Sequence, residues 1–319
     1  MKSKIQTKLS LLFVTLAVAG NLLAKPTKTI YEFESDDGGF RTKTIFYDNG
    51  EEVVAFDTQF TEKYAEQSIQ FLKTKTKTPI KYIVISHPNP DKFNAIPSFK
   101  KLGAKVIASK QTIESMKGVH EYKKYYWTKI AKAFTEANYP KLGKVDIEFE
   151  GTYELKLKNG DSLRLTELGT KGVSTNQTVS YIPEQNAFIV GDLIHFKTHA
   201  WLEGGIQNGK PNPNVNEWIV SLDKLKSFGN SETLVFGGRG KAAKLFDAVT
   251  EQKKYLKEVD EIVNDYIKDL GVLQTELKSD MANKHYQELE KRISKEFPEY
   301  ALPYMVGYGI YGLVNSKLQ

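Results

Sequence analysis

A short apolar run that ends in alternating polar residues and prolines most constrains the fold of this chain. Residues 80–85 are rich in β-branched side chains and too few for a helix, so they predict a buried strand. Three polar side chains follow at alternate positions, with prolines between them: His87, Asn89 and Asp91. Because proline neither donates to a sheet ladder nor extends a helix, this segment predicts a rigid loop at a strand end. Rigidly held loops often carry chemistry, so this loop is the first candidate site.

The motif from His87 to Lys92 resembles the metal-binding signature of the metallo-β-lactamase superfamily. In that family a strand ends in His-x-His-x-Asp-His, and a helix and a second strand follow, to which residues 94–109 are similar. Later segments similar to the family's lie, in the family's order, at 172–183, 188–193 and 234–240. The resemblance covers residues 29–245 and implies an α/β (α+β) fold, a four-layer αββα sandwich.

The resemblance implies seven metal-ligand positions, of which this chain keeps three. The retained residues, which are the candidate catalytic and metal-binding residues, are His87, Asp91 and Asp192. The four positions at which the family has histidine carry Asn89, Lys92, Val173 and Arg239. A catalytic zinc usually takes three imidazole, thiolate or carboxylate ligands from the protein. The first metal site would keep one of its three histidines, so we expect either no cofactor or a zinc ion at a reduced, mononuclear site.

Two of the replacements are cationic and offer a substitute for the missing metal charge. Two carboxylates turned into one cavity repel each other, and burial without a cation would raise a carboxyl pKa. Arginine stays protonated and can hold a carboxylate through two parallel hydrogen bonds. We therefore predict an ion-pair cluster of Arg239 with Asp91 and Asp192, to which Lys92 adds charge. The alternative is that Arg239 points to solvent.

Two further histidines follow the retained Asp192. His195 and His199 are four residues apart, a spacing that would place both on one helix face and could hold a metal. Either could join the retained residues in a shifted mononuclear site. The alternative is that both are hydrogen-bonded structural residues. Nearby Trp201 is predicted to pack in the core rather than to stack on a ligand.

The first 24 residues have the pattern of an export signal. Lysines at positions 2, 4 and 8 precede an apolar core at 9–18, and Ala24 offers a cleavage point before Lys25. An uncleaved membrane anchor is the alternative, although a spanning helix needs about 20 apolar residues. The pattern predicts an exported protein, periplasmic or secreted, with no membrane span after the signal is removed.

Composition narrows the classes of function. The net charge of +6 includes three lysines of the signal, and the remaining 42 basic and 39 acidic residues leave +3. This excess is too small to indicate nucleic acid as a partner. The chain has no cysteine, and so no disulfide, thiolate ligand or cysteine nucleophile.

Three parts of the chain are predicted from pattern: a signal at 1–24, a metallo-β-lactamase-like domain at 25–245 and a helical C-terminal extension at 246–319. Strands are expected within 28–57 and 147–167, and helices at 61–73, 218–228, 243–269 and 273–297. Asp57 corresponds to a family residue that supports the metal-site loop, and a turn or cap role is the alternative without the resemblance. The lysine- and aromatic-rich residues 118–139 fit a helix with a solvated face, or a flap over a pocket, better than a nucleic-acid surface. The apolar end at 300–314 is expected to pack on the core.

Two classes of function remain open at this point. The first is a non-catalytic relative of the hydrolases. It would bind an unknown small molecule or protein in the cleft where the family holds its metal ions. The second is a β-lactamase-like or esterase-like hydrolase that uses a mononuclear metal and its bound water. Fold alone does not decide between them.

Overall fold

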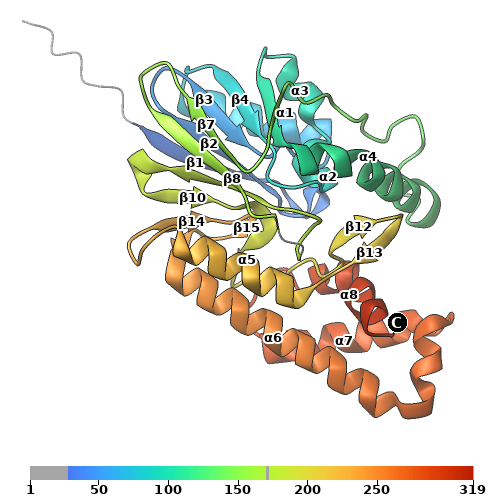
Figure 1. Cartoon of the computed structure of the whole chain (residues 1–319). Coiled ribbons are helices and arrows are strands. Elements are labelled where there is room, and N and C mark those ends of the chain that lie inside the picture. Colours follow the sequence, from blue (N-terminus) through green and yellow to red (C-terminus); the bar gives the residue numbers. More distant parts are fainter. Residues whose placement is uncertain (1–27, 170–171, 319) are drawn as a thin grey trace, which may run out of the picture.

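The computed structural model describes residues 28–169 and 172–318, and it shows two facing sheets with helices on both outer sides (Figure 1). The predicted export signal at 1–24 lies outside the described residues. The first sheet has the strand order β1-β2-β3-β4-β5-β6. Its strands are β1 (Thr29–Glu34), β2 (Lys43–Asp48), β3 (Val53–Phe56), β4 (Ile80–Val84), β5 (Lys105–Ser109) and β6 (Ile147–Phe149). β3 to β6 run parallel, so the segments after β3 and β4 leave the sheet at the same edge.

The second sheet has the order β16-β14-β10-β9-β8-β7. Its strands are β7 (Thr152–Lys156), β8 (Ser162–Glu167), β9 (Thr178–Ile182), β10 (Ala187–Ile189), β14 (Leu234–Phe236) and β16 (Ala243–Lys244). β10 and β14 are parallel neighbours, and the segments after them pair again as β11 (His195–Phe196) and β15 (Arg239–Gly240). This second pairing places His195 directly opposite Arg239. A hairpin of β12 (Gly205–Gln207) and β13 (Lys210–Asn212) lies outside both sheets.

Helices cover the outer face of each sheet. Over the first sheet lie α1 (Glu62–Lys75), α2 (Pro90–Phe93), α3 (Ile96–Lys100) and α4 (Lys110–Tyr125), and α4 continues into a π-helix at Tyr126–Ile130. Over the second lie α5 (Val215–Ser227) and α6 (Leu245–Leu270), and α7 (Ala282–Glu296) and α8 (Tyr304–Lys317) pack beside α6 (Figure 1). In α1 the buried Ala65, Ile69 and Leu72 recur at helical spacing and face the sheet. No helix in the described part of the chain is long and apolar enough to cross a bilayer.

Three of the four buried apolar clusters among the described residues hold these layers together, and the side chains of β2 show how. Every residue of β2 is buried, because both faces of its sheet are covered. Phe46 packs in the core under α1 and α3, whereas Ile45 and Tyr47 pack in the core between the two sheets. A third core joins the second sheet to α5, α6, α7 and α8. The αββα sandwich and the helical C-terminal region that the sequence predicted are therefore present.

Some helix boundaries in the structure differ from those predicted. Thr61 precedes α1 as predicted, but its side chain makes no capping hydrogen bond. The helix predicted at 273–297 is wrong in its first half: a 3-10 helix spans Gly271–Lys278, and α7 begins at Ala282. Ser279 interrupts the helix because its hydroxyl accepts a hydrogen bond from the backbone of Met281, at 3.1 Å, as serine commonly does in turns.

Candidate functional site

The loop after β4 is fixed by a carboxylate from the end of β3. Asp57 accepts hydrogen bonds from the backbone N–H and the hydroxyl of Ser86, both at 2.8 Å. Burial raises the pKa of Asp57 to about 7, although the nearby Lys92 ammonium opposes the rise. The supporting role expected of Asp57 is therefore confirmed. The loop itself differs from the prediction, because Pro90 begins a single helical turn, α2, that carries Asp91 and Lys92.

Two glycines let three loops approach closely enough to share one site. Gly191 has a left-handed backbone (φ +51°), and a Cβ there would collide with the side chain of Ser86. A Cβ at Gly238 would collide with the carboxylate of Asp192. The loops after β4, β10 and β14 thus come together because two of their contacts have no room for a side chain.

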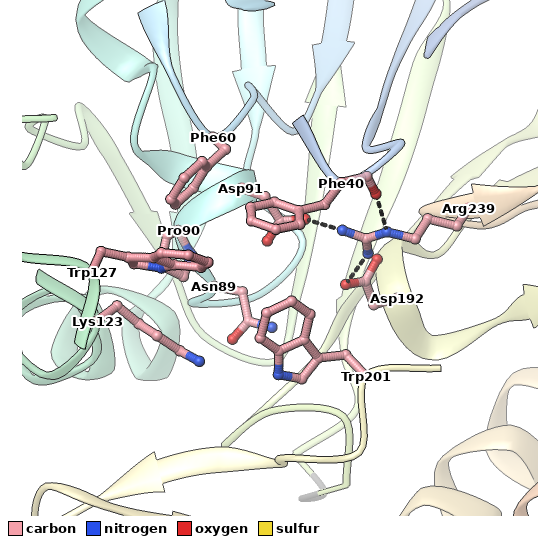
Figure 2. Close-up of a pocket in the computed structure, with 10 residues that line it drawn as sticks. All are labelled: Phe40, Phe60, Asn89, Pro90, Asp91, Lys123, Trp127, Asp192, Trp201 and Arg239. Atoms are coloured by element: carbon pink, nitrogen blue, oxygen red, sulfur yellow. Dashed lines mark hydrogen bonds and ion pairs between the residues drawn. The ribbon is translucent and has the colours of Figure 1, made fainter. Parts of the chain in front are cut away.

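The ion-pair cluster predicted from the sequence is present. Arg239 donates from Nη1 to Asp192 Oδ2 at 2.8 Å and from Nη2 to Asp91 Oδ2 at 3.0 Å (Figure 2). Lys92 Nζ lies 2.8 Å from a carboxylate oxygen of each aspartate. Arg239 also donates to the backbone oxygen of Phe40 at 2.7 Å. Its side chain is only 2% exposed, which contradicts the alternative that it points to solvent.

The two cations set the ionisation of the two carboxyls. Burial alone would raise the pKa of Asp192, but Arg239 and Lys92 hold it well below its ordinary value. Burial likewise opposes the lowered pKa of Asp91, which Lys92 and Arg239 keep below its ordinary value. The pKa of Lys92 is in turn raised against burial by Asp192 and Asp91. Two negative and two positive side chains therefore balance in a nearly dry cluster.

Two buried histidines lie beside this cluster. The Nε2 atom of His87 is 3.7 Å from Asp192 Oδ2, and that of His195 is 4.0 Å from Asp192 Oδ1. Neither Nε2 atom has a hydrogen-bond partner among the described residues. Burial lowers the pKa of His87 to about 4 and that of His195 to about 3, so both rings are neutral at pH 7.

The other predicted site residues lie apart or play a different role. Val173 packs in the apolar core that joins the second sheet to its helices. The expectation that His195 and His199 share a helix face is wrong, because Lys197 has a positive φ and turns the chain after β11. His199 faces away from the cluster, with Nδ1 3.2 Å from the hydroxyl of Tyr255. Asn89 lines the hollow described below, and its carboxamide makes no hydrogen bond to another described residue.

The donor set in this cluster does not fit a zinc ion. Zinc requires deprotonated donors that converge on a point, and here that space is filled by the Lys92 ammonium and the Arg239 guanidinium. Each retained carboxylate already accepts from both cations. Within residues 28–169 and 172–318 no three histidine, aspartate or glutamate side chains are arranged to hold a metal. A divalent cation would have to displace two buried positive charges.

A small hollow, open to solvent, lies directly above the cluster (Figure 2). Its aromatic walls are Phe40, Phe60, Trp127 and Trp201. Its polar lining comprises Asn89, Asp91, Lys123, Asp192 and Arg239. As expected, Trp201 packs against a buried aromatic cluster, and its half-buried ring also borders the hollow.

Several residues of the hollow were not singled out from the sequence. Trp127 belongs to the aromatic-rich stretch for which a flap was considered, and it is presented by the π-helix, a feature frequent at functional sites. Phe40 and Lys123 carry no motif. They reach the hollow through contacts that join distant segments, and single-residue patterns do not reveal such contacts.

Comparisons with known proteins agree with the αββα fold described above. The sequence model of the metallo-beta-lactamase superfamily matches residues 37–238, more than half of the chain. A search of curated proteins gave no match. The fold is similar to a metallo-beta-lactamase from Pontibacter korlensis (17% identity, TM-score 0.53, 72% of this chain and 94% of that one). It is also similar to TMB-1 (18%, 0.51, 72% and 97%) and to the DIM-1 metallo-beta-lactamase (14%, 0.50, 72% and 92%). At these identities the structures support the shared fold alone.

Proposed function

Because this chain belongs to the metallo-beta-lactamase superfamily, we propose that it is an exported relative that binds a small molecule in the former cleft, without zinc and without hydrolysis. The observation that carries this proposal is that Lys92 and Arg239 each bridge Asp91 and Asp192. These two cations supply the positive charge that the carboxylates need. The aromatic hollow above them offers a place for a ligand.

Energetics favour the cations over a metal. Removing one partner from a buried ion pair costs on the order of 3–5 kcal/mol, because the remaining charge is left uncompensated. A zinc ion would have to displace two such partners and would gain few donors in return. The site is therefore expected to stay free of zinc even when zinc is supplied.

A metal-dependent hydrolase is the second candidate, and one observation favours it. The Ser86 hydroxyl donates a hydrogen bond to Asp57 and lies 2.9 Å from Nδ1 of His87, so its oxygen can accept a hydrogen bond from Nδ1–H. This tautomer leaves Nε2 of His87 with a free lone pair directed toward Asp192. A reduced site built on these residues would still require Lys92 and Arg239 to move away.

Zinc content separates the two candidates. Protein purified without added zinc and dialysed should hold far less than one zinc per chain by elemental analysis. A double variant, Lys92→His with Arg239→His, removes both cations and adds two imidazoles, so its zinc content after loading should exceed that of the parent. Near-stoichiometric zinc in the dialysed parent would contradict the proposal and favour the hydrolase.

A further inference from the structure

A long groove follows helix α1 on the outer side of the first sheet, where Figure 1 shows α1 and α3. Three hollows make up this α1 groove, and the space open to water in them measures about 620, 600 and 390 Å³. Lys101 lines the first and the second hollow, and Leu102 lines the second and the third. The first begins at Thr61, just before α1, and the third reaches Thr76 at its end. The groove therefore runs the full length of the helix.

The α1 groove has the dimensions of a short peptide. α1 has 14 residues, which at a rise of 1.5 Å per residue make it about 21 Å long. An extended chain rises by about 3.3 Å per residue, so about six residues would fill the groove from end to end. Each hollow alone lies within the range of about 300–1,000 Å³ for ligand pockets. The continuous groove thus suits a chain better than one small molecule.

The lining of the α1 groove is strongly basic. Of the residues that the structure describes, five lysines line it: Lys63, Lys73, Lys77, Lys101 and Lys141. Two glutamates, Glu62 and Glu66, also line it and leave a net charge of +3. The whole chain without its predicted signal carries the same net charge of +3, from 42 basic and 39 acidic residues. The excess positive charge of the chain is therefore concentrated in this groove.

Several of these lysines are available to a ligand. Lys101 forms an ion pair with Glu62. Lys73, Lys77 and Lys141 are exposed and form no ion pair with any residue that the structure describes. The groove thus differs from the cluster of Arg239 and Lys92, in which each cation is already paired. An anionic partner would find unpaired cations here.

The stability of α1 does not account for this arrangement of lysines. A lysine in the last turn, such as Lys73, stabilises a helix through the helix dipole. Lys63 lies in the first turn, where a positive charge is unfavourable for the same reason. Lys141 lies between the π-helix and β6, outside any helix. What these three lysines share is their place along one groove.

The floor of the α1 groove is apolar. Ile69 and Leu72 of α1 are buried in it, and Leu102 after α3 keeps 45% exposure beside them. A flat bilayer surface would not reach a recessed floor. Single-stranded nucleic acid would need a row of rings on which to stack, but Phe134 and Tyr139 lie in one hollow only, and Tyr139 is buried. The floor therefore favours a chain that carries apolar side chains.

From these observations we infer that the α1 groove docks an extended acidic segment of a partner protein, in which carboxylates alternate with apolar side chains. Alternate side chains of an extended chain point to opposite sides. The apolar ones would pack on the floor beside Leu102, and the carboxylates would lie near Lys63, Lys73 and Lys141 at the rim. None of these lysines belongs to the ion-pair cluster, so the inference goes beyond the proposed function and does not depend on it.

Three labelled peptides test the inference by fluorescence anisotropy on the purified protein. The first alternates glutamate and leucine over about six residues. The second has lysine in place of each glutamate, and the third has serine in place of each leucine. The glutamate–leucine peptide should bind with a Kd below about 100 μM, the lysine peptide at least about tenfold more weakly and the serine peptide about fivefold more weakly. Raising the salt concentration from about 0.05 to about 0.2 M should weaken the binding of the first peptide several-fold, because exposed ion pairs are screened.

Matched variants localise the binding to the groove. Lys73→Glu reverses the charge of a lysine that lines two of the hollows, so the affinity for the glutamate–leucine peptide should fall about tenfold. Lys257→Glu, at an exposed position on α6, changes the net charge equally and should leave the affinity within about twofold. Leu102→Ser should weaken binding about threefold, because it removes apolar contact at the floor. All three side chains are exposed, so the variants are expected to fold.

Other results would assign the groove differently. The inference is wrong if the glutamate–leucine peptide does not saturate by about 1 mM, or if Lys257→Glu weakens binding as much as Lys73→Glu. Vesicles of phosphatidylglycerol with phosphatidylcholine and a labelled oligothymidylate are the competing probes. Tighter binding of either one, lost in Lys73→Glu, would replace the acidic segment by a membrane or a nucleic acid. Zinc content, which tests the proposed function, is independent of all these outcomes.

Discussion

At the scale of single residues, Arg239 shows how one side chain can stand in for part of a metal ion's charge. Its guanidinium holds Asp192, Asp91, Thr42 and the backbone of Phe40 at once. Arginine suits this place because it stays protonated and presents its donors in a fixed fork. The position is one at which the family has a histidine, so the replacement exchanges a metal ligand for a permanent charge.

Arg239→Ala should destabilise the protein and reverse the pH dependence of its stability. In the parent the pKa of Asp192 lies well below its value of about 3.9 in the unfolded chain, so the stabilisation persists above pH 4 and is lost as the pH falls further. Without Arg239, burial should raise the pKa of the carboxyl pair above the unfolded value. The variant should then gain stability as the pH falls from 7 toward 4. At pH 7 the loss should be about 3–5 kcal/mol, measured by denaturant unfolding across pH.

Controls for this prediction lie in the same chain. Arg164→Ala, at an exposed position, should change stability by no more than about 0.5 kcal/mol. Adding Asp192→Asn to Arg239→Ala should cost less than the sum of the two single changes, because no uncompensated charge remains. An Arg239→Ala variant that unfolds like the parent at every pH would show that the ion pairs do not stabilise the fold.

This cluster could be predicted from the sequence because two of its residues depart from a recognisable family motif. Arg239 and Lys92 stand where the family has ligands, and charge balance then indicated their partners. The contacts of His199 and Trp201 could not be predicted in detail, because the residues that make them lie far along the chain. Tyr255, which contacts His199, and Tyr308, which stacks on Trp201, belong to helices for which no motif gives a position.

At the scale of elements, α8 is the part of the C-terminal extension that reaches the hollow. Its glycines allow a close approach to the segment after Trp201, and its tyrosines contact Trp201 and Glu203. The family match ends at residue 238, before α8 begins. One wall of the hollow is thus supported by a helix outside the matched region.

Gly309→Ala tests this docking. The added methyl group would meet the backbone of Leu202, so α8 must shift, and the free energy of unfolding should fall by about 1–3 kcal/mol. The matched control is Gly118→Ala in α4, where nothing lies within 4 Å of the new Cβ. That change should stabilise the protein by about 0.5–1 kcal/mol through helix propensity. Equal melting temperatures for the two variants would mean that α8 does not pack closely on residue 202.

Elements with strong periodicity were predicted well, and short elements that lack a period were not. The strands of the first sheet lie within the segments in which strands were expected, and α6 ends at Leu270, close to the predicted end at residue 269. The turn α2 and the break before α7 involve local hydrogen bonds to Asn89 and Ser279. Such bonds leave no periodic trace in a sequence.

At the scale of the whole molecule, the C-terminal helices share one apolar core with the second sheet. Val179 and Phe188 of the sheet, Leu256 of α6 and Ile310 of α8 belong to the same buried cluster. The predicted division at residue 245 therefore separates segments of the sequence that fold around common side chains. An apolar C-terminal segment was expected to pack on the core, and it does.

The predicted export signal can be checked on the intact protein. Expressed in a bacterial host, the mature chain should begin at Lys25, because cleavage is expected after Ala24. Intact mass spectrometry of the exported fraction measures this directly. A mass that retains the first 24 residues would support the membrane-anchor alternative instead.

The bridging of both carboxylates by Lys92 and Arg239 has a consequence for how the cleft responds to its surroundings. Occupancy of a metal site follows the free metal concentration and is lost by dilution or to a chelator. Counter-ions that belong to the same polypeptide have an effective concentration set by the fold, which neither dilution nor a chelator can change. The charge balance beneath the hollow is thus inherited with the chain rather than acquired from solution.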